Sequence, residues 1–297
     1  MHETRQKIIV IVGPTASGKS ALALWLAKKV SGEIISADSR QVYKGLDIGT
    51  GKLSKKEKQG VPHYLLDAAS PKRVFTVNDF KKKGERAIQK IIRNKKNPII
   101  CGGTGFYIQA LIDDMTLPNV SPNKKLRERL GNRPVIELYT MLKRLDPTRA
   151  KTIDQKNKRR LIRAIEIIQS LGKVPPFLQK RKFDTLFIGL YAKDIKKNIK
   201  ERLFKRMRQG LISEGIRLHK KGLSYKRMEN LGLEYKYLSC LIQNKISKTG
   251  FVRDLERAIN QYAKRQMTWF KKDKRINWFF PDEKKKILEL VRNFYGS

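Results

Sequence analysis

Lys7-Ile8-Ile9-Val10-Ile11-Val12, followed by Gly13-Pro14-Thr15-Ala16-Ser17-Gly18-Lys19-Ser20, is the stretch of this 297-residue chain that decides its fold. Its first six residues are β-branched except for Lys7, a composition that predicts a buried parallel strand. The next eight match G-x-x-x-x-G-K-[ST], the pattern of a phosphate-binding loop. Residues 21–27 are good helix formers and continue the motif. Strand, loop and helix therefore follow one another in the order that this motif requires.

The residue types of this loop suit the binding of an anion. Gly13 and Gly18 allow the backbone to turn so that successive N–H groups point at one phosphate. The start of the following helix adds the positive end of its dipole. Lys19 supplies a full charge, and the Ser20 hydroxyl is a ligand for Mg²⁺. We predict that residues 13–20 bind a phosphate compound, whose identity the motif leaves open.

The charge balance of the chain is strongly basic, with 67 Lys and Arg residues against 27 Asp and Glu and a net charge of +40. A charge of this size favours a polyanionic partner, although a generally lysine-rich composition is the alternative.

The apolar run at residues 8–12 leads directly into the loop, so we interpret it as a strand and not as a signal peptide. No run is long enough to span a membrane, and we expect a cytoplasmic monomer. Cys101 and Cys240 form no zinc or disulfide pattern.

Further strands are predicted at residues 32–37, 62–67, 97–101, 185–191 and 275–280, alternating with helices at 75–94, 106–112, 193–210, 251–271 and a last one ending at Tyr295. Asp38 directly follows the second strand, and ligands of such sheets lie beyond the carboxyl ends of strands. Asp38 is therefore a candidate site residue, with a helix N-cap as the alternative. Gly102-Gly103-Thr104-Gly105 is a second glycine-rich turn that suggests a backbone approaching a ligand, though many tight turns look alike.

Proline residues and helical periodicity replace the strand pattern from about Met115. Residues 151–182 hold ten Lys or Arg against two acids, which gives a net +8. Such a segment suits a clamp on a nucleic-acid backbone, and a solvated helix face is the alternative. We predict an α/β fold with a P-loop NTPase-like parallel sheet flanked by helices, divided into residues 1–114, a helical insertion at 115–183, and residues 184–297.

Taken together, these stretches resemble the tRNA dimethylallyltransferases, which modify an adenosine beside the anticodon. The matching segments are residues 13–20, 38–50, 102–107, 159–166 and 262–266, and the likeness extends from residue 7 to about residue 280. The most specific is Asp38-Ser39-Arg40-Gln41-Val42-Tyr43-Lys44-Gly45, because it follows a phosphate-binding loop.

The resemblance implies that the core binds dimethylallyl diphosphate and Mg²⁺ and that the insertion grips the anticodon stem-loop of tRNA. It implies transfer of the dimethylallyl group to the N6 amine of the adenosine 3′ to the anticodon, with release of diphosphate. Asp38 would be the base, and Lys19, Thr104 and Arg202 would also serve catalysis. The residues implied to contact tRNA are Asp38, Ser39, Arg40, Gln41, Thr104, Arg127, Arg159, Arg160, Leu161, Ile162 and Arg163.

This chemistry is physically consistent with those residues. The lone pair of an adenine amine is delocalised, so a carboxylate that accepts its proton raises the nucleophilicity of the nitrogen. Lys19, the loop N–H groups, Mg²⁺ on Ser20 and Arg202 would stabilise the leaving diphosphate. Three alternatives stay open from the sequence: a small-molecule kinase, a prenyltransferase acting on free adenine nucleotides, and a non-enzymatic RNA-binding protein.

Overall fold

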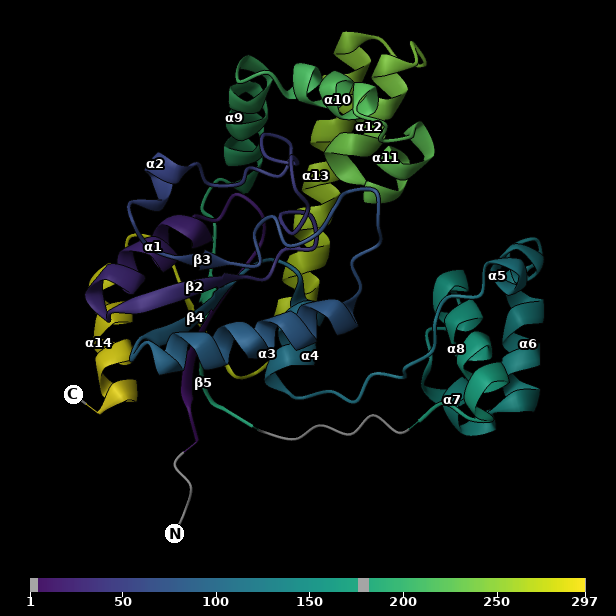
Figure 1. The fold of residues 1–297 in the computed structure, drawn as a ribbon, viewed down its shortest axis with the longest axis horizontal. Coiled ribbons are helices and arrows are strands. Elements are labelled where there is room, and N and C mark those ends of the chain that lie inside the picture. The colour runs from purple at the N-terminus through teal and green to yellow at the C-terminus, as the bar shows by residue number, and fades with distance from the viewer. Residues whose placement is uncertain (1–4, 176–181, 297) are drawn as a thin grey trace. The chain divides into compact units, whose positions relative to one another are not determined.

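The structure is a computed structural model, and it describes residues 5–175 and 182–296. The chain divides into two compact units, one formed by residues 1–114 with 181–297 and the other by residues 115–180. Figure 1 shows the ribbon of both, coloured along the chain.

One parallel sheet organises the larger unit. Within the described residues it has six strands in the order β3-β2-β4-β1-β5-β6. Their bounds are β1 Lys7–Val12, β2 Gly32–Ser36, β3 His63–Tyr64, β4 Asn97–Cys101, β5 Asp184–Leu190 and β6 Ile276–Phe279. β1 lies in the middle, pairing with β4 through Val10 and Ile100 and with β5 through Val10 and Phe187. The predicted α/β fold with a parallel sheet is confirmed.

Helices cover both faces of this sheet because its central strands are apolar on both sides, as in other parallel sheets. One face packs with α3 (Val77–Arg93), α4 (Gly105–Ile112), α9 (Ile195–Arg208) and α13 (Lys248–Phe270) in a large core that includes Phe80 and Phe251. The other face packs against α1 (Lys19–Lys29) and α14 (Lys284–Tyr295). The remaining helices of this unit are α2 (Lys55–Lys58), α10 (Leu211–Lys220), α11 (Tyr225–Leu231) and α12 (Leu233–Ile242).

The smaller unit consists of helices within its described residues: α5 (Lys124–Gly131), α6 (Val135–Leu145), α7 (Pro147–Thr152) and α8 (Lys158–Leu171). Their apolar faces form a separate core around Leu130, Leu138 and Leu161. Three of the four helices begin at a side-chain cap, Asn123, Asp146 or Asn157, each of which accepts a hydrogen bond from a backbone N–H three residues on.

Two local predictions need adjustment. The strand expected over residues 62–67 contains only His63 and Tyr64, because Leu65 and Asp67 have positive φ angles that end the extended backbone. The helix expected from residue 75 begins at Val77, because Thr76 is its N-cap and forms a reciprocal capping box with Asp79.

Candidate active site

The loops that follow β1, β4 and β2 lie side by side at the carboxyl edge of the sheet, because these three strands are neighbours. The Gly102 N–H donates to the Ile11 carbonyl at 3.1 Å, and the Ala37 N–H donates to the Cys101 carbonyl at 2.9 Å. A Cβ at Gly102 would lie 2.1 Å from the Ala37 oxygen, so only glycine permits this approach. The structure thus brings the phosphate-binding loop, the Gly102–Gly105 turn and Asp38 to one place.

The phosphate-binding loop has the backbone that its motif predicts. Gly13 and Gly18 have φ angles of 142° and 88°, which belong to glycine. A Cβ at Gly13 would also lie 2.7 Å from the Leu190 carbonyl at the end of β5. Helix α1 begins at Gly18 without a side-chain cap and has no acidic residue in its first turn. Its first N–H groups are therefore left for an anion, unlike those of the side-chain-capped helices.

Lys19 is half-buried at the start of α1, and its Nζ donates to the Pro14 carbonyl across the loop. Burial and, to a smaller extent, Arg202 lower the pKa of Lys19 to about 8, while Cys101 and Asp38 act in the opposite direction. Lys19 is consequently still charged at neutral pH. An anionic ligand would favour its charged form further.

Asp38 follows β2 and is half-buried. Its Oδ1 accepts hydrogen bonds from the N–H groups of Arg40 at 2.8 Å and Gln41 at 3.2 Å. No helix follows within this described segment, so the N-cap alternative is wrong: the carboxylate caps a turn. Both of these hydrogen bonds from backbone N–H groups fall on Oδ1.

Thr104 ties the turn after β4 to the loop that carries Asp38. Its Oγ1 accepts from the Ser39 N–H at 3.0 Å, and its own N–H donates to the Ala37 carbonyl at 3.1 Å. Helix α4 starts at Thr104 and, like α1, has no side-chain cap. Two uncapped helix starts therefore border the site.

Gln266 on α13 joins the two glycine-rich loops. Its Oε1 accepts from the Thr15 N–H at 2.8 Å, and its Nε2 donates to the Gly103 carbonyl at 2.9 Å. Only 6% of its surface is exposed. The sequence placed Gln266 in a matching segment but assigned it no role, because its partners are 251 and 163 residues away.

Arg202 on α9 is exposed but lies near the same site, since its charge affects the pKa of Lys19 and the charge of Asp38 affects its own. Desolvation and the neighbouring Arg206 lower the pKa of Arg202 to about 10. Arg206 is buried; its Nη1 donates to the Gly49 carbonyl at 3.0 Å and to Glu234 Oε1 at 2.9 Å. Arg206 thus has a fixed structural pairing, whereas no ion pair joins Arg202 to a carboxylate among the described residues.

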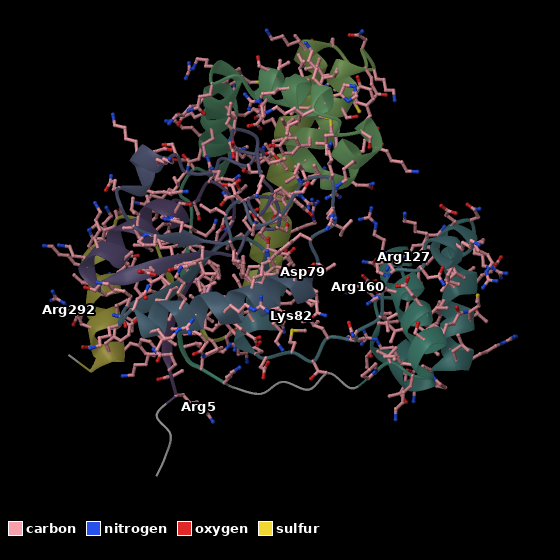
Figure 2. The ribbon with its side chains drawn as sticks, viewed as in Figure 1. Arg5, Asp79, Lys82, Arg127, Arg160 and Arg292 are labelled. Atoms are coloured by element: carbon pink, nitrogen blue, oxygen red, sulfur yellow. The ribbon has the colours of Figure 1, made fainter. Side chains whose placement is uncertain are left out.

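The residues predicted to contact tRNA in the insertion belong to the smaller unit, and they differ in their environments. Arg127 and Arg163 both bind Glu166, at 2.7 and 2.6 Å, and Glu166 is 1% exposed. Arg159 and Arg160 are exposed, and Figure 2 labels Arg127 and Arg160 among the side chains of this unit.

Leu161 is predicted to contact tRNA, but its side chain is fully buried in the core of the smaller unit. Its neighbour Ile162 is half-buried. The side chain of Leu161 therefore supports the helix instead of facing solvent. Its apolar character and helical spacing with Ile165 would have indicated this.

None of the helices in the described part of the chain is long and apolar enough to cross a membrane. The described residues also contain no group of three or more His, Cys, Asp or Glu side chains that could hold a metal ion.

Comparison with known proteins supplies the family. The sequence model of a family described as IPP transferase matches residues 41–273. The chain belongs to this family. It is 39% identical to a tRNA dimethylallyltransferase from Halothermothrix orenii, over 94% of this chain and 89% of that protein. It is 43% identical to tRNA dimethylallyltransferase 2 from Treponema denticola, over 91% of this chain and 94% of that protein.

A solved structure supports the same assignment to the IPP transferase family. The full-length tRNA isopentenylpyrophosphate transferase from Bacillus halodurans aligns with a TM-score of 0.74 and 32% identity, covering 98% of this chain and 97% of the other. Because both chains are covered almost completely, the family assignment extends to both units.

Proposed function

We propose that this protein transfers the dimethylallyl group of dimethylallyl diphosphate to the N6 amine of the adenosine 3′ to the anticodon of tRNA. The relatives named above are tRNA dimethylallyltransferases. The observation that carries the proposal here is the position of Asp38: its loop is bonded to the turn that lies against the phosphate-binding loop. One carboxylate thus lies beside one anion site, near enough for Asp38 to raise the pKa of Lys19.

The residues divide the reaction between them. The N6 nitrogen attacks the allylic carbon, the new C–N bond forms, and the C–O bond to diphosphate breaks. Asp38 takes the proton that the amine loses, and Gln41 and Thr104 border the base. Lys19, the loop N–H groups and Arg202 stabilise the charge of the departing diphosphate. The target base has to leave its stack to reach Asp38, which costs a few kcal/mol and costs least in a loop.

Ser20 would fit a magnesium ion. Its hydroxyl is exposed in the first turn of α1, at the end of the phosphate-binding loop. Mg²⁺ is commonly held by few protein ligands together with substrate phosphates and water, so one hydroxyl beside a diphosphate site suffices. When bound, the metal supplies positive charge that favours loss of diphosphate.

The test is transfer of label from dimethylallyl diphosphate, with Mg²⁺, to an unmodified anticodon stem-loop. Wild type is compared with Asp38→Asn, which keeps the size of the side chain and loses the base. We expect a rate lower by about 10²–10⁴-fold in Asp38→Asn while RNA binding persists. Asp254→Asn, which removes a partly exposed carboxylate paired with Arg253, is the control and should retain full activity.

Other acceptors distinguish the alternatives. Label on free adenosine monophosphate and not on RNA would show that the acceptor is a free nucleotide. No label on any RNA, together with ATP turnover, would indicate a kinase and overturn the proposal. RNA binding with neither reaction would indicate a binding protein.

A further inference from the structure

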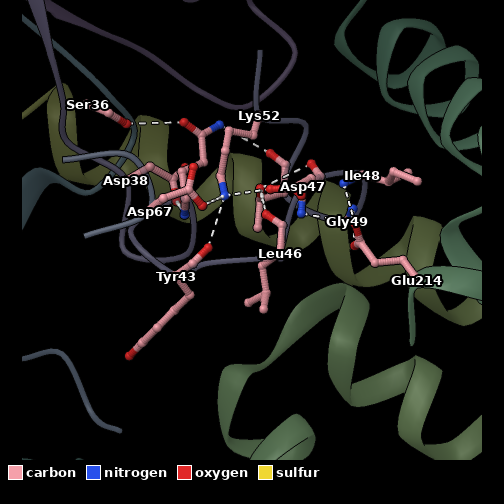
Figure 3. Close-up of polar contacts among 12 residues, drawn as sticks. Ser36, Asp38, Tyr43, Leu46, Asp47, Ile48, Gly49, Lys52, Asp67 and Glu214 are labelled. Carbon is pink, nitrogen blue, oxygen red and sulfur yellow. Dashed lines mark hydrogen bonds and ion pairs between the residues drawn. The ribbon is translucent and has the colours of Figure 1, made fainter. Parts of the chain in front are cut away.

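Three consecutive backbone N–H groups of the loop behind Asp38 point at one carboxylate. Glu214 on α10 accepts hydrogen bonds from the N–H groups of Asp47 at 3.0 Å, Ile48 at 2.7 Å and Gly49 at 3.0 Å. Figure 3 shows Glu214 facing this segment, with dashed lines to the backbone. Glu214 is 1% exposed and therefore fully enclosed by protein.

The remaining contact of this carboxylate is also a neutral donor. The Tyr235 hydroxyl donates to Glu214 Oε1 at 2.7 Å, and burial together with Glu214 raises the pKa of this phenol well above its ordinary value. A buried carboxylate is costly unless its oxygens are hydrogen-bonded. These four donors satisfy Glu214, so the segment 47–49 and the carboxylate hold one another in place.

Thr50 and Gly51, which directly follow this segment, lie against two of the residues proposed to face the substrates. The Thr50 carbonyl accepts from Gln41 Nε2 at 3.3 Å, and the Gly49 carbonyl accepts from Arg206. A Cβ at Gly51 would lie 3.0 Å from Arg202 Nη2, which shows how closely Arg202 packs on this backbone. Glu214 therefore holds residues 47–49, and the backbone that continues from them to Gly51 contacts Gln41 and Arg202.

A lysine closes the ends of this loop. Lys52 Nζ binds the Tyr43 carbonyl at 3.0 Å, Asp47 Oδ1 at 2.7 Å and Asp67 Oδ1 at 2.6 Å, and only 4% of its side chain is exposed. Figure 3 shows Lys52 among these oxygens. Lys52 thus binds the side chain of Asp47, whereas Glu214 binds the backbone N–H groups of residues 47–49 and so fixes the orientation of that backbone.

We propose that Glu214 is a positioning residue for the prenyl transfer: by binding three N–H groups of residues 47–49, it sets Gln41 and Arg202 in the geometry that the reaction needs. This inference rests on the proposed function. Because Glu214 is enclosed by protein, it touches neither substrate. It acts through the backbone of residues 47–51, which contacts both Gln41 and Arg202. A displacement of about 1 Å in a positioned group can cost about 10²-fold in rate.

The experiment measures kcat and KM for dimethylallyl diphosphate, and the Kd of the stem-loop, in wild type and Glu214→Gln. The amide has the size of the carboxylate but presents an NH₂ group to N–H donors. We expect kcat about 100-fold lower, with the Kd of the stem-loop within about twofold of wild type. Tyr235→Phe removes one donor and leaves the three backbone bonds, so its kcat should fall by less than about threefold. Glu229→Gln, an exposed glutamate on α11, should match wild type.

Several outcomes would overturn the inference. These are a kcat of Glu214→Gln within about threefold of wild type, a Tyr235→Phe defect as large as that of Glu214→Gln, or an equal weakening of RNA binding. The last two would show that Glu214 only joins α10 to the rest of the unit. If Glu214→Gln does not fold, Glu214→Asp decides by the same criteria. An inactive wild type would refute the proposed function, whereas an active wild type with an equally active variant refutes only the role of Glu214.

Discussion

Glu166 connects two helices of the smaller unit, and its replacement by glutamine should loosen that unit alone. The carboxylate is 1% exposed and accepts from Arg127 Nε at 2.8 Å, Arg163 Nη1 at 2.6 Å and the Asn123 N–H at 2.7 Å. Asn123 is the cap of α5, and Glu166 lies on α8. Glu166→Gln removes the charge and leaves two arginines without their partner.

The size of the effect follows from the pKa of this carboxyl. Burial by itself raises it, but the hydrogen bonds from Arg127, Arg163 and the Asn123 N–H outweigh burial and lower the pKa of Glu166 from 4.5 to about 2. This difference of about 2.5 pKa units corresponds to about 3.4 kcal/mol at about 1.36 kcal/mol per unit. The side chains of Arg127 and Arg163 are 42% and 34% exposed, so solvent screening reduces this stabilisation. We therefore expect Glu166→Gln to lower the stability of the smaller unit by about 2 kcal/mol.

The pH dependence has a definite sign. The pKa of Glu166 is lower in the folded state than in the unfolded state, so the ionised carboxylate stabilises the fold fully above about pH 4.5. This stabilisation is lost as the pH falls towards 2 and Glu166 becomes protonated. Wild type and Glu166→Gln should therefore differ most near neutral pH. Their stabilities should converge as Glu166 becomes protonated.

Hydrogen exchange read by mass spectrometry measures the effect locally. Peptides from α5 and α8 should exchange about 30-fold faster in Glu166→Gln at pH 7, which corresponds to about 2 kcal/mol. Glu128→Gln, an exposed glutamate on α5, is the matched control and should exchange like wild type. A change below about threefold at pH 7, or a difference that persists undiminished at pH 3 after correction for intrinsic rates, would refute the reasoning.

Three further predictions concern the phosphate site, the sheet edge and the smaller unit. Because the pKa of Lys19 is about 8, calorimetry should show proton uptake on diphosphate binding at pH 9, absent at pH 7; uptake in Lys19→Arg equal to wild type would contradict this. Gly102→Ala should lower the free energy of unfolding by about 3 kcal/mol, since its Cβ would meet the Ala37 oxygen at 2.1 Å; Gly131→Ala, with open space around it, should leave denaturant unfolding nearly unchanged. Replacing the exposed Arg159 and Arg160 by alanine should weaken the salt dependence of stem-loop binding. The slope of log affinity against log salt concentration should fall in magnitude by about 0.7 for each phosphate that is no longer neutralised, and an unchanged slope would exclude both arginines from the interface.

Local sequence alone determined the centre of the larger unit. The apolar strand Lys7–Val12, the glycines of the loop and the helix formers after Lys19 interact within about twenty residues, so their pattern is sufficient to specify β1, the phosphate-binding loop and α1. The position of Asp38 was predictable for the same reason, since a residue that ends a parallel strand lies at the carboxyl edge of its sheet.

Only the tertiary structure decided which polar side chains bind each other. Glu214 meets the Asp47 N–H across 167 residues, and Gln266 meets the Thr15 N–H across 251 residues. Arg127 and Arg160 look alike in the sequence, yet Arg127 binds buried Glu166 whereas Arg160 is exposed. Periodicity and motif spacing describe local backbone geometry, but a buried carboxylate selects its donors from whatever the packed chain brings within hydrogen-bonding distance.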